Sequence, residues 1–179
     1  MSEAHQQRLV LAAQAGSPRA FDELLRRWER PLFRHARRML ASDDEAYDAL
    51  QQAFLAIVRS IRSLRRREQF RPWAYGVVTR VCLKARARRG EAEEVEERLP
   101  DDAPSPELLA AASERRESLL AEVLTLSPRV RSVVLLHFYE GLSLPEVAAA
   151  LDIELGTVKS RLGAGLQKLR SNEEVQDHA

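Results

Sequence analysis

The residues with the clearest potential for chemistry in this chain lie between positions 156 and 161, where the sequence reads Gly-Thr-Val-Lys-Ser-Arg. If Val158 and Leu162 face inward on a helix, the remaining side chains face outward or lie at its flanks. Side chains near the start of such a helix reach base edges in the major groove of DNA, and arginine binds guanine through two hydrogen bonds. The alternative is a helical hairpin whose basic side chains are merely solvated. The candidate DNA-binding residues are Gly156, Thr157, Lys159, Ser160 and Arg161.

A second basic group lies in the first half of the chain. Residues 56–90 hold 11 basic side chains and one acidic side chain, Glu68. Arg80, Lys84 and Arg88 recur every four residues, so on a helix they form one stripe of like charge, which is unfavourable unless an anion offsets it. This pattern predicts a surface that binds a polyanion such as DNA.

The sequence lacks the motifs that would indicate catalysis. It has no phosphate-binding loop, no dinucleotide-binding glycine pattern and no H-E-x-x-H metal motif, and its four histidines are scattered. The single cysteine, Cys82, precludes an internal disulfide and a cysteine-cluster metal site. We expect no enzymatic activity, no cofactor and no metal.

The ends and apolar runs of the sequence bear on its location. No apolar run approaches the roughly 20 residues needed to cross a bilayer. The first residues also lack the order of a signal peptide. We expect a cytoplasmic protein with no direct membrane insertion.

The elements that must position the candidate residues are helical by their periodicity. Apolar residues from Phe21 to Leu40 recur at helical spacing, with an interruption expected at Pro31. A capping box at Ser42–Glu45 opens a helix. The residues expected to be buried on that helix are Leu50, Ala53, Phe54, Ile57, Val58 and Ile61. A further helix begins near residues 70–73.

The second half shows the same organisation. Ser127-Pro128 starts a helix that ends at Gly141, and Ser143–Glu146 forms a second capping box. A last helix is expected to bury Leu155, Val158, Leu162, Leu166 and Leu169. Two short helices joined by about four residues match a helix-turn-helix. We find no alternating strand pattern, so the predicted fold class is all-α.

Residues 90–113 predict a linker between two small helical domains. Three prolines lie between positions 100 and 106, and residues 91–113 carry a net charge of −7. We predict domains at 1–90 and 114–171, a flexible acidic linker at 91–113 and a tail at 172–179. The linker charge could imitate nucleic acid, or the segment could be a solubilising tether.

The two predicted domains resemble those of bacterial sigma factors. Residues 119–170, with the 156–161 motif, resemble the promoter-binding region 4. Residues 20–89 resemble region 2 through the runs at 21–25, 48–55 and 70–75. A chain with these two domains and no middle domain resembles the extracytoplasmic-function (ECF) group. The resemblance implies a sigma factor that binds core RNA polymerase, recognises and melts promoter DNA, and initiates transcription.

The resemblance also implies roles for particular residues. The helix after the Ser42 cap would dock on the coiled coil of the polymerase β′ subunit, and the β subunit would be a further partner. The residues expected to bind core polymerase are Asp48, Gln51, Gln52, Leu55 and Arg59. The residues expected to engage the −10 element are Arg65, Arg66, Arg67, Gln69, Tyr75, Arg80, Lys84 and Arg88. The residues between 156 and 161 would engage the −35 element. Trp73 and Tyr75 could stack on unpaired bases or pack in the core, and core packing is favoured for Trp73.

Two departures from the family pattern suggest an alternative. Gln52 stands where relatives usually have Glu, and Gly163 and Gly165 stand where relatives tend to have basic residues. Each glycine inside a helix costs about 1 kcal/mol relative to alanine, and phosphate contacts from that turn are also absent. We therefore expect weaker binding to the −35 element, or reliance on a partner beside it. The alternative is a sigma-like decoy that binds a regulator without initiating transcription. An enzyme with a helix-turn-helix tail is a second alternative, but residues 1–90 offer it no nucleophile or acid cluster. Relatives are often controlled by an anti-sigma factor, and we expect such a partner here.

Overall fold

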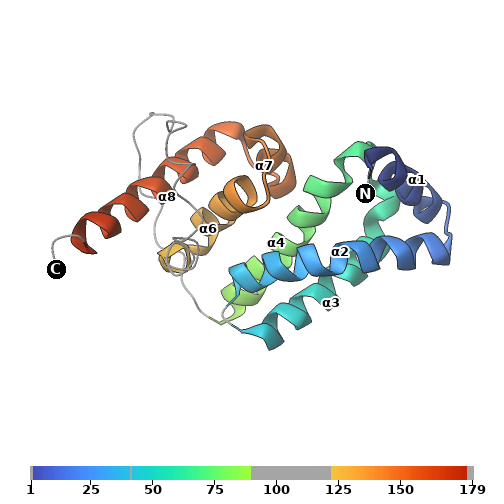
Figure 1. The fold of residues 1–179 in the computed structure, drawn as a ribbon, viewed down its shortest axis with the longest axis horizontal. Coiled ribbons are helices and arrows are strands. Elements are labelled where there is room, and N and C mark those ends of the chain that lie inside the picture. The colour runs from blue at the N-terminus through green and yellow to red at the C-terminus, as the bar shows by residue number, and fades with distance from the viewer. Residues whose placement is uncertain (1, 41, 90–121, 177–179) are drawn as a thin grey trace.

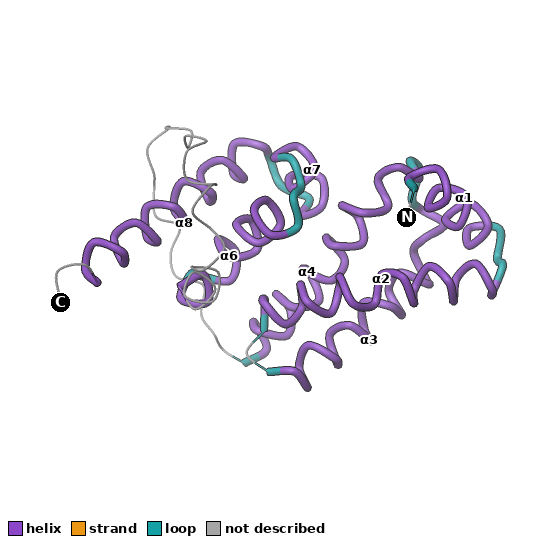
Figure 2. Tube along the Cα trace, viewed as in Figure 1, coloured by secondary structure: helices purple, strands orange, loops and turns teal. Residues whose placement is uncertain are grey.

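The structure is a computed structural model that describes residues 2–40, 42–89 and 122–176, with side chains described as far as residue 171. Throughout these ranges the regular structure is helical, which confirms the all-α fold class (Figures 1 and 2). The elements are α1 (Glu3–Gln14), α2 (Pro18–Met39), α3 (Asp43–Ser60), η1 (Ile61–Ser63), η2 (Arg67–Gln69), α4 (Phe70–Arg88), α6 (Pro128–Val134), η4 (Leu135–Tyr139), α7 (Leu144–Leu151) and α8 (Leu155–Gln176). The predicted linker at 91–113 lies outside the described residues.

Helices α2, α3 and α4 form a bundle at the centre of the first half (Figure 1). Helix α2 buries one stripe that includes Leu24, Trp28 and Leu32, with Ala36 and Met39 continuing it one and two turns later. The 3–4 residue spacing of this stripe is why the segment folds as an amphipathic helix. The bundle therefore holds α3 and α4 at fixed positions against α2.

The expected interruption at Pro31 is wrong, because α2 continues through it from Pro18 to Met39. Proline removes one backbone hydrogen bond from a helix and crowds the preceding turn. Here the residues on either side of it, Trp28 and Leu32, are buried in the bundle. Packing of the apolar stripe therefore outweighs the local cost of the proline.

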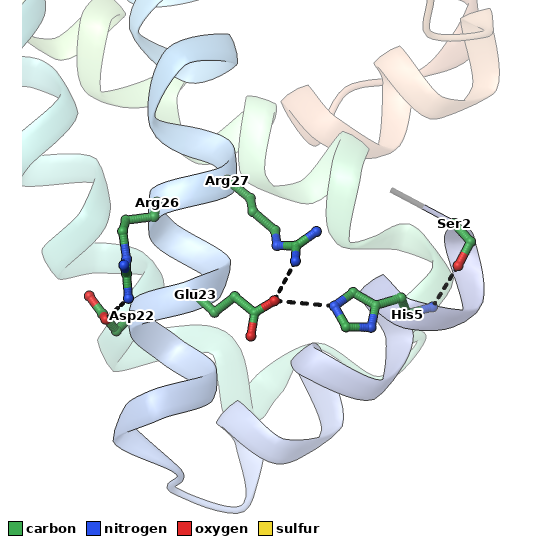
Figure 3. Close-up of polar contacts among 6 residues, drawn as sticks. All are labelled: Ser2, His5, Asp22, Glu23, Arg26 and Arg27. Carbon is green, nitrogen blue, oxygen red and sulfur yellow. Dashed lines mark hydrogen bonds and ion pairs between the residues drawn. The ribbon is translucent and has the colours of Figure 1, made fainter.

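Helix α1 packs on α2 and is tied to it by polar contacts (Figure 3). The Ser2 hydroxyl accepts a hydrogen bond from the His5 backbone N–H at 3.4 Å and caps the helix. The His5 ring contacts Glu23, with 3.2 Å between Nε2 and Oε1, and Glu23 also pairs with Arg27. Hydrogen bonds from His5 and Arg27 hold the pKa of Glu23 below its usual value. The N-terminal helix is thus held to the bundle by a polar contact between His5 and Glu23 as well as by apolar contacts.

The second half contains the predicted helix-turn-helix. Ser143 and Glu146 form a reciprocal capping box at the start of α7, as expected: the Glu146 N–H donates to the Ser143 hydroxyl, and the Ser143 N–H donates to the Glu146 carboxylate. Helix α7 ends at Leu151 and is followed by Asp152, whose φ of 56° lies in the left-handed region. Two further residues lead into α8, which packs on α6.

Two apolar side chains are more exposed than their spacing predicted. Val58 on α3 is 46% exposed and Leu155 at the start of α8 is 38% exposed. Each lies at the edge of its helix's apolar stripe, and no neighbouring helix covers it in the described structure. The expectation that both are buried is therefore wrong, whereas Val158 and Leu162 are buried as predicted.

The two halves are in contact, chiefly through α4 and α7. Glu140, which follows η4, is buried between them and contacts His35 and Arg38 of α2. The apolar core is continuous across this boundary. None of the helices in the described ranges combines the length and the apolar character that a membrane crossing requires.

Candidate polymerase and nucleic-acid interfaces

The outer face of α3 gathers the five residues predicted to bind polymerase. The Ser42 hydroxyl caps the helix by accepting the Glu45 N–H at 3.3 Å. The opposite face is buried in the bundle, so the helix can present only this one. The exposed residues on it are Asp48, Gln51, Gln52, Leu55 and Arg59. Leu55 is 56% exposed, which makes it a large apolar side chain in a polar surrounding.

Two residues that the sequence reasoning missed extend this α3 face. Tyr47 is 52% exposed and lies one and two turns before Gln51 and Leu55. Its ring packs against Phe33 of α2, with 4.3 Å between the ring centroids. Exposed Val58 continues the apolar part after Leu55. An exposed apolar stripe of this kind is a feature of protein-binding surfaces.

The basic turn between α3 and α4 is held from behind by α1. The Gln14 side-chain amide donates to the carbonyl oxygens of Ile61 and Leu64 at 3.0 and 2.7 Å. Its amide oxygen accepts a hydrogen bond from Arg67 Nε at 3.0 Å. The sequence analysis did not predict this role, because Gln14 is about 50 residues away along the chain. The predicted −10 residues that this arrangement leaves exposed are Arg65, Arg66, Arg67 and Gln69.

Helix α4 presents the basic stripe as predicted. Arg80, Lys84 and Arg88 are exposed on it at intervals of one turn. Partial burial lowers the pKa of Arg80, and the nearby Asp152 carboxylate opposes that shift. Since the guanidinium remains charged at neutral pH, the stripe is cationic.

Tyr75 does not belong to this surface. Its side chain is 4% exposed and packs edge-to-face against Trp28 and His35, at 5.9 and 5.3 Å between ring centroids. Burial, together with the neighbouring Glu140 carboxylate, raises the pKa of its hydroxyl. The prediction that Tyr75 stacks on DNA bases is wrong for this conformation, because the ring has no accessible face. Trp73 is partly buried and packs against Phe70, which favours the core role for it.

The start of α8 presents the predicted −35 residues. Gly156, Lys159 and Ser160 are exposed, and Thr157 and Arg161 are partly exposed. A side-chain carbon added at Gly156 would meet no atom within 4 Å, so the first turn of α8 faces open space. Because Val158 and Leu162 anchor the opposite face, the whole predicted set is brought to one end of one helix.

The two glycines that follow the α8 motif differ from each other. Gly163 faces open space, whereas a Cβ on Gly165 would lie 2.7 Å from Val134 Cγ2 and 3.1 Å from Val130 Cγ1. Gly165 therefore lets α8 approach α6 closely. Its cost in helix propensity is offset by that packing, a reason the sequence alone did not reveal.

Comparison with known proteins agrees with this architecture. Residues 24–92 match the family model for sigma-70 region 2, and residues 116–169 match that for sigma-70 region 4. The chain therefore belongs to the sigma-70 family. Within it, the curated relatives identify an ECF sigma factor.

Three of those relatives show the extent of the similarity. SigE, an ECF sigma factor of Mycolicibacterium smegmatis, is 33% identical over 162 residues, which cover 88% of this chain and 62% of the relative. The sigma-E factor of Streptomyces coelicolor is 33% identical over 159 residues, covering 88% of each chain. The ECF sigma-E factor of Escherichia coli K12 is 29% identical over 166 residues, covering 86% of each.

Solved structures share the fold. CnrH in complex with the cytosolic domain of CnrY matches with a TM-score of 0.68 at 22% identity, covering 95% of this chain and 97% of that one. RpoE of Bartonella quintana, in complex with the anti-sigma factor NepR, matches with a TM-score of 0.65 at 19% identity, covering 87% and 97%.

Proposed function

We propose that this sigma factor binds core RNA polymerase through the exposed face of α3 and binds promoter DNA through two separate surfaces. The −10 element would contact the basic turn at residues 65–69 and the Arg80–Lys84–Arg88 stripe. The −35 element would contact the start of α8. The observation that carries the proposal is the amphipathic start of α8, directly after a capped α7 and a left-handed turn at Asp152.

The proposed binding roles are assigned to two parts of the chain. Residues 1–90 would form the unit that binds polymerase and the −10 element, and residues 114–171 the unit that binds the −35 element. The role would be that of a transcription initiation factor in the cytoplasm, without catalytic activity of its own. The described residues include no cluster of three or more metal-ligating side chains, and the proposed role needs none.

An anti-sigma factor is the proposed regulator. The similar structure of the Bartonella RpoE was solved in complex with the anti-sigma factor NepR, and that of CnrH in complex with the cytosolic domain of CnrY. The exposed apolar residues on α3, together with the basic stripe on α4, offer surfaces that a regulatory protein could cover. Such a partner would compete with polymerase or with DNA for those surfaces.

The polymerase contact is tested by the affinity of purified core enzyme for two matched variants. Leu55→Ser and Leu11→Ser each remove an exposed leucine, 56% and 48% exposed, but only Leu55 lies on the α3 face. We expect Leu55→Ser to weaken binding at least tenfold, as for a buried interface anchor. Leu11→Ser should bind like the wild type. Equal affinities for the two variants would contradict the assignment of this face.

The −35 contact is tested with the assembled holoenzyme. Arg161→Ala should weaken binding to promoter DNA by about 5- to 150-fold, corresponding to 1–3 kcal/mol for a base contact. Gln167→Ala, an exposed residue two turns later on α8, is the matched control and should have little effect. If holoenzyme forms but neither protein binds any promoter, the decoy function is favoured instead.

A further inference from the structure

The helix-turn-helix half of the molecule packs on the helix that carries the predicted −10 stripe. Gly76 and Arg80 lie one turn apart on α4, and both contact Ala150 near the end of α7. Arg80 is the first member of the Arg80–Lys84–Arg88 stripe. Helix α7 therefore lies against the N-terminal end of that stripe and contacts Arg80, although Arg80 stays exposed.

Gly76 is what permits this contact. A Cβ built on it would lie 2.2 Å from the Ala150 carbonyl oxygen and 3.0 Å from the Ala150 Cα. Any side chain at this position would collide with backbone atoms, which cannot rotate away. Ala150 supplies all three of the nearest atoms, so a side chain at Gly76 disturbs the contact with α7 first.

Arg80 strengthens the same contact. Its Nη1 donates to the Ala150 carbonyl oxygen at 2.5 Å. Ala150 lies in the last turn of α7, where carbonyl groups lack helical partners and the helix dipole favours a cation. In this conformation, a guanidinium expected to face the DNA backbone is engaged by the protein itself.

Glu140 makes a second, independent contact between the halves. It is 8% exposed, and its Oε1 lies 3.3 Å from His35 Nδ1 and 3.1 Å from Arg38 Nη1. Its carbonyl oxygen accepts a hydrogen bond from Arg71. His35, Arg38 and Arg71 of the first half thus all contact this one residue of the second half.

This closed arrangement is incompatible with occupation of both promoter elements. Ala150 touches α4, and Gly156 is six Cα–Cα steps further along the chain, so at about 3.8 Å per step the start of α8 lies within about 27 Å of Gly76. The centres of the −10 and −35 elements are about 25 base pairs apart, which is about 85 Å at 3.4 Å per base pair. The two halves must therefore separate before both elements are bound.

We propose that docking of α7 on α4, reinforced by Glu140, is an autoinhibitory contact in the free chain. It engages the Arg80 guanidinium of the −10 surface and holds the −35 surface too close to that surface. The proposed polymerase residues on α3 remain exposed in the same conformation. Core polymerase can therefore bind the closed chain first, and promoter binding follows after opening. This inference rests on the proposed function for its consequence, but not for the contact itself.

The contact is tested by small-angle X-ray scattering on the free full-length chain, without DNA or polymerase. Gly76→Ala adds one methyl group at the contact, and Gly163→Ala adds one where nothing lies within 4 Å. We expect the wild type and Gly163→Ala to share a radius of gyration near the roughly 16 Å of a compact chain of this length. Gly76→Ala should exceed about 20 Å. Equal radii for the wild type and Gly76→Ala would overturn the proposal.

A second variant and a measurement of helix content distinguish opening of the two halves from unfolding. Glu140→Ala removes the other contact and should also increase the radius. Circular dichroism should show that both variants keep wild-type helix content, since each change lies at the boundary between the halves. Expansion that is accompanied by loss of helix would count against the proposal, because it would indicate unfolding rather than opening.

The functional consequence is measured separately. If nine-tenths of the wild-type chain is closed, opening raises the apparent affinity of the free chain for promoter DNA about tenfold. Gly76→Ala should show that gain, while its affinity for core polymerase stays within about twofold of the wild type. Expansion without any promoter binding by either protein would refute the proposed function and leave the intramolecular contact intact. Expansion with promoter affinity equal to that of the wild type would overturn autoinhibition.

Discussion

His35 and Glu140 form a buried pair between residues that lie 105 positions apart in the sequence, with 3.3 Å between Nδ1 and Oε1. The other ring nitrogen of His35 lies 2.8 Å from the Thr79 hydroxyl, which in turn donates to the Tyr75 carbonyl oxygen at 2.8 Å. The pair therefore links α2, α4 and the start of the helix-turn-helix half through one chain of hydrogen bonds. A buried carboxylate without partners is costly. We therefore expect these hydrogen bonds to specify how the two halves meet.

Acid should weaken this contact. Burial alone would raise the pKa of Glu140, but hydrogen bonds from His35 and Tyr75 and the charge of Arg38 outweigh it and lower the pKa. A carboxyl group whose pKa is lowered by folding stabilises the fold where it is ionised. Its contribution is complete above its ordinary pKa of 4.5 and is lost as the pH falls through the lowered value.

The measurement for Glu140 is the free energy of unfolding from urea titrations between pH 6 and pH 3. The wild type should lose more stability over this interval than Glu140→Gln, which has no carboxyl group to protonate at this position. The comparison subtracts the other acidic groups that titrate in the same range. Parallel pH profiles for the two proteins would show that Glu140 does not contribute in this way.

The two glycines of α8 should respond in opposite directions to alanine. Gly163→Ala should stabilise the protein by up to about 1 kcal/mol, because alanine favours the helix and the added methyl group meets open space. Gly165→Ala should destabilise it by about 1–3 kcal/mol, since the methyl group collides with Val134 and crowds Val130. Thermal unfolding of the two variants measures the difference. Stabilisation by both would mean that α8 can move away from α6 at no cost.

Cys82 should be unreactive in the folded protein. It is fully buried, and burial raises the pKa of its thiol to about 12. Since only the thiolate is nucleophilic, the group is protonated and inaccessible at pH 8. A thiol-specific reagent should modify it at least a hundredfold faster in denaturant than in buffer. Rapid modification of the native protein would place Cys82 at a surface instead.

Gln14→Ala should impair the −10 surface without affecting polymerase binding. The substitution removes hydrogen bonds to the carbonyl oxygens of Ile61 and Leu64, each worth about 0.5–1.5 kcal/mol. The basic turn would then lose its support from α1. We expect slower promoter melting by the holoenzyme. The melting rate is measured from the chemical reactivity of unpaired thymines. Gln7→Ala on the same helix is the control, and equal melting rates for the two variants would argue against a positioning role for Gln14.

The sequence was informative where structure depends on neighbours within one helix. The Ser143–Glu146 capping box and the exposed face of α8 both follow from spacing within a few residues, and the structure contains both. The exposure of Leu55 follows from the same reasoning, because the apolar stripe of α3 lies on the other side.

The features that the sequence did not predict depend on contacts between distant segments. The apolar pattern does not distinguish Val58 from Ile57, because exposure at the edge of a stripe depends on whether another helix covers it. Tyr75 was assigned to DNA because its ring suits stacking, yet Trp28 and His35 of α2 enclose it. Gly76 carries no signal in its own segment, and its importance emerges only from the position of Ala150.

The most direct test of the central claim is run-off transcription from genomic DNA fragments with core polymerase, in the presence and absence of this protein. The account predicts discrete start sites that depend on the added protein and disappear with Asp48→Ala, which alters the α3 face. Normal binding to core polymerase with no new transcript from any fragment would contradict it, and would instead support a sigma-like protein that does not initiate transcription.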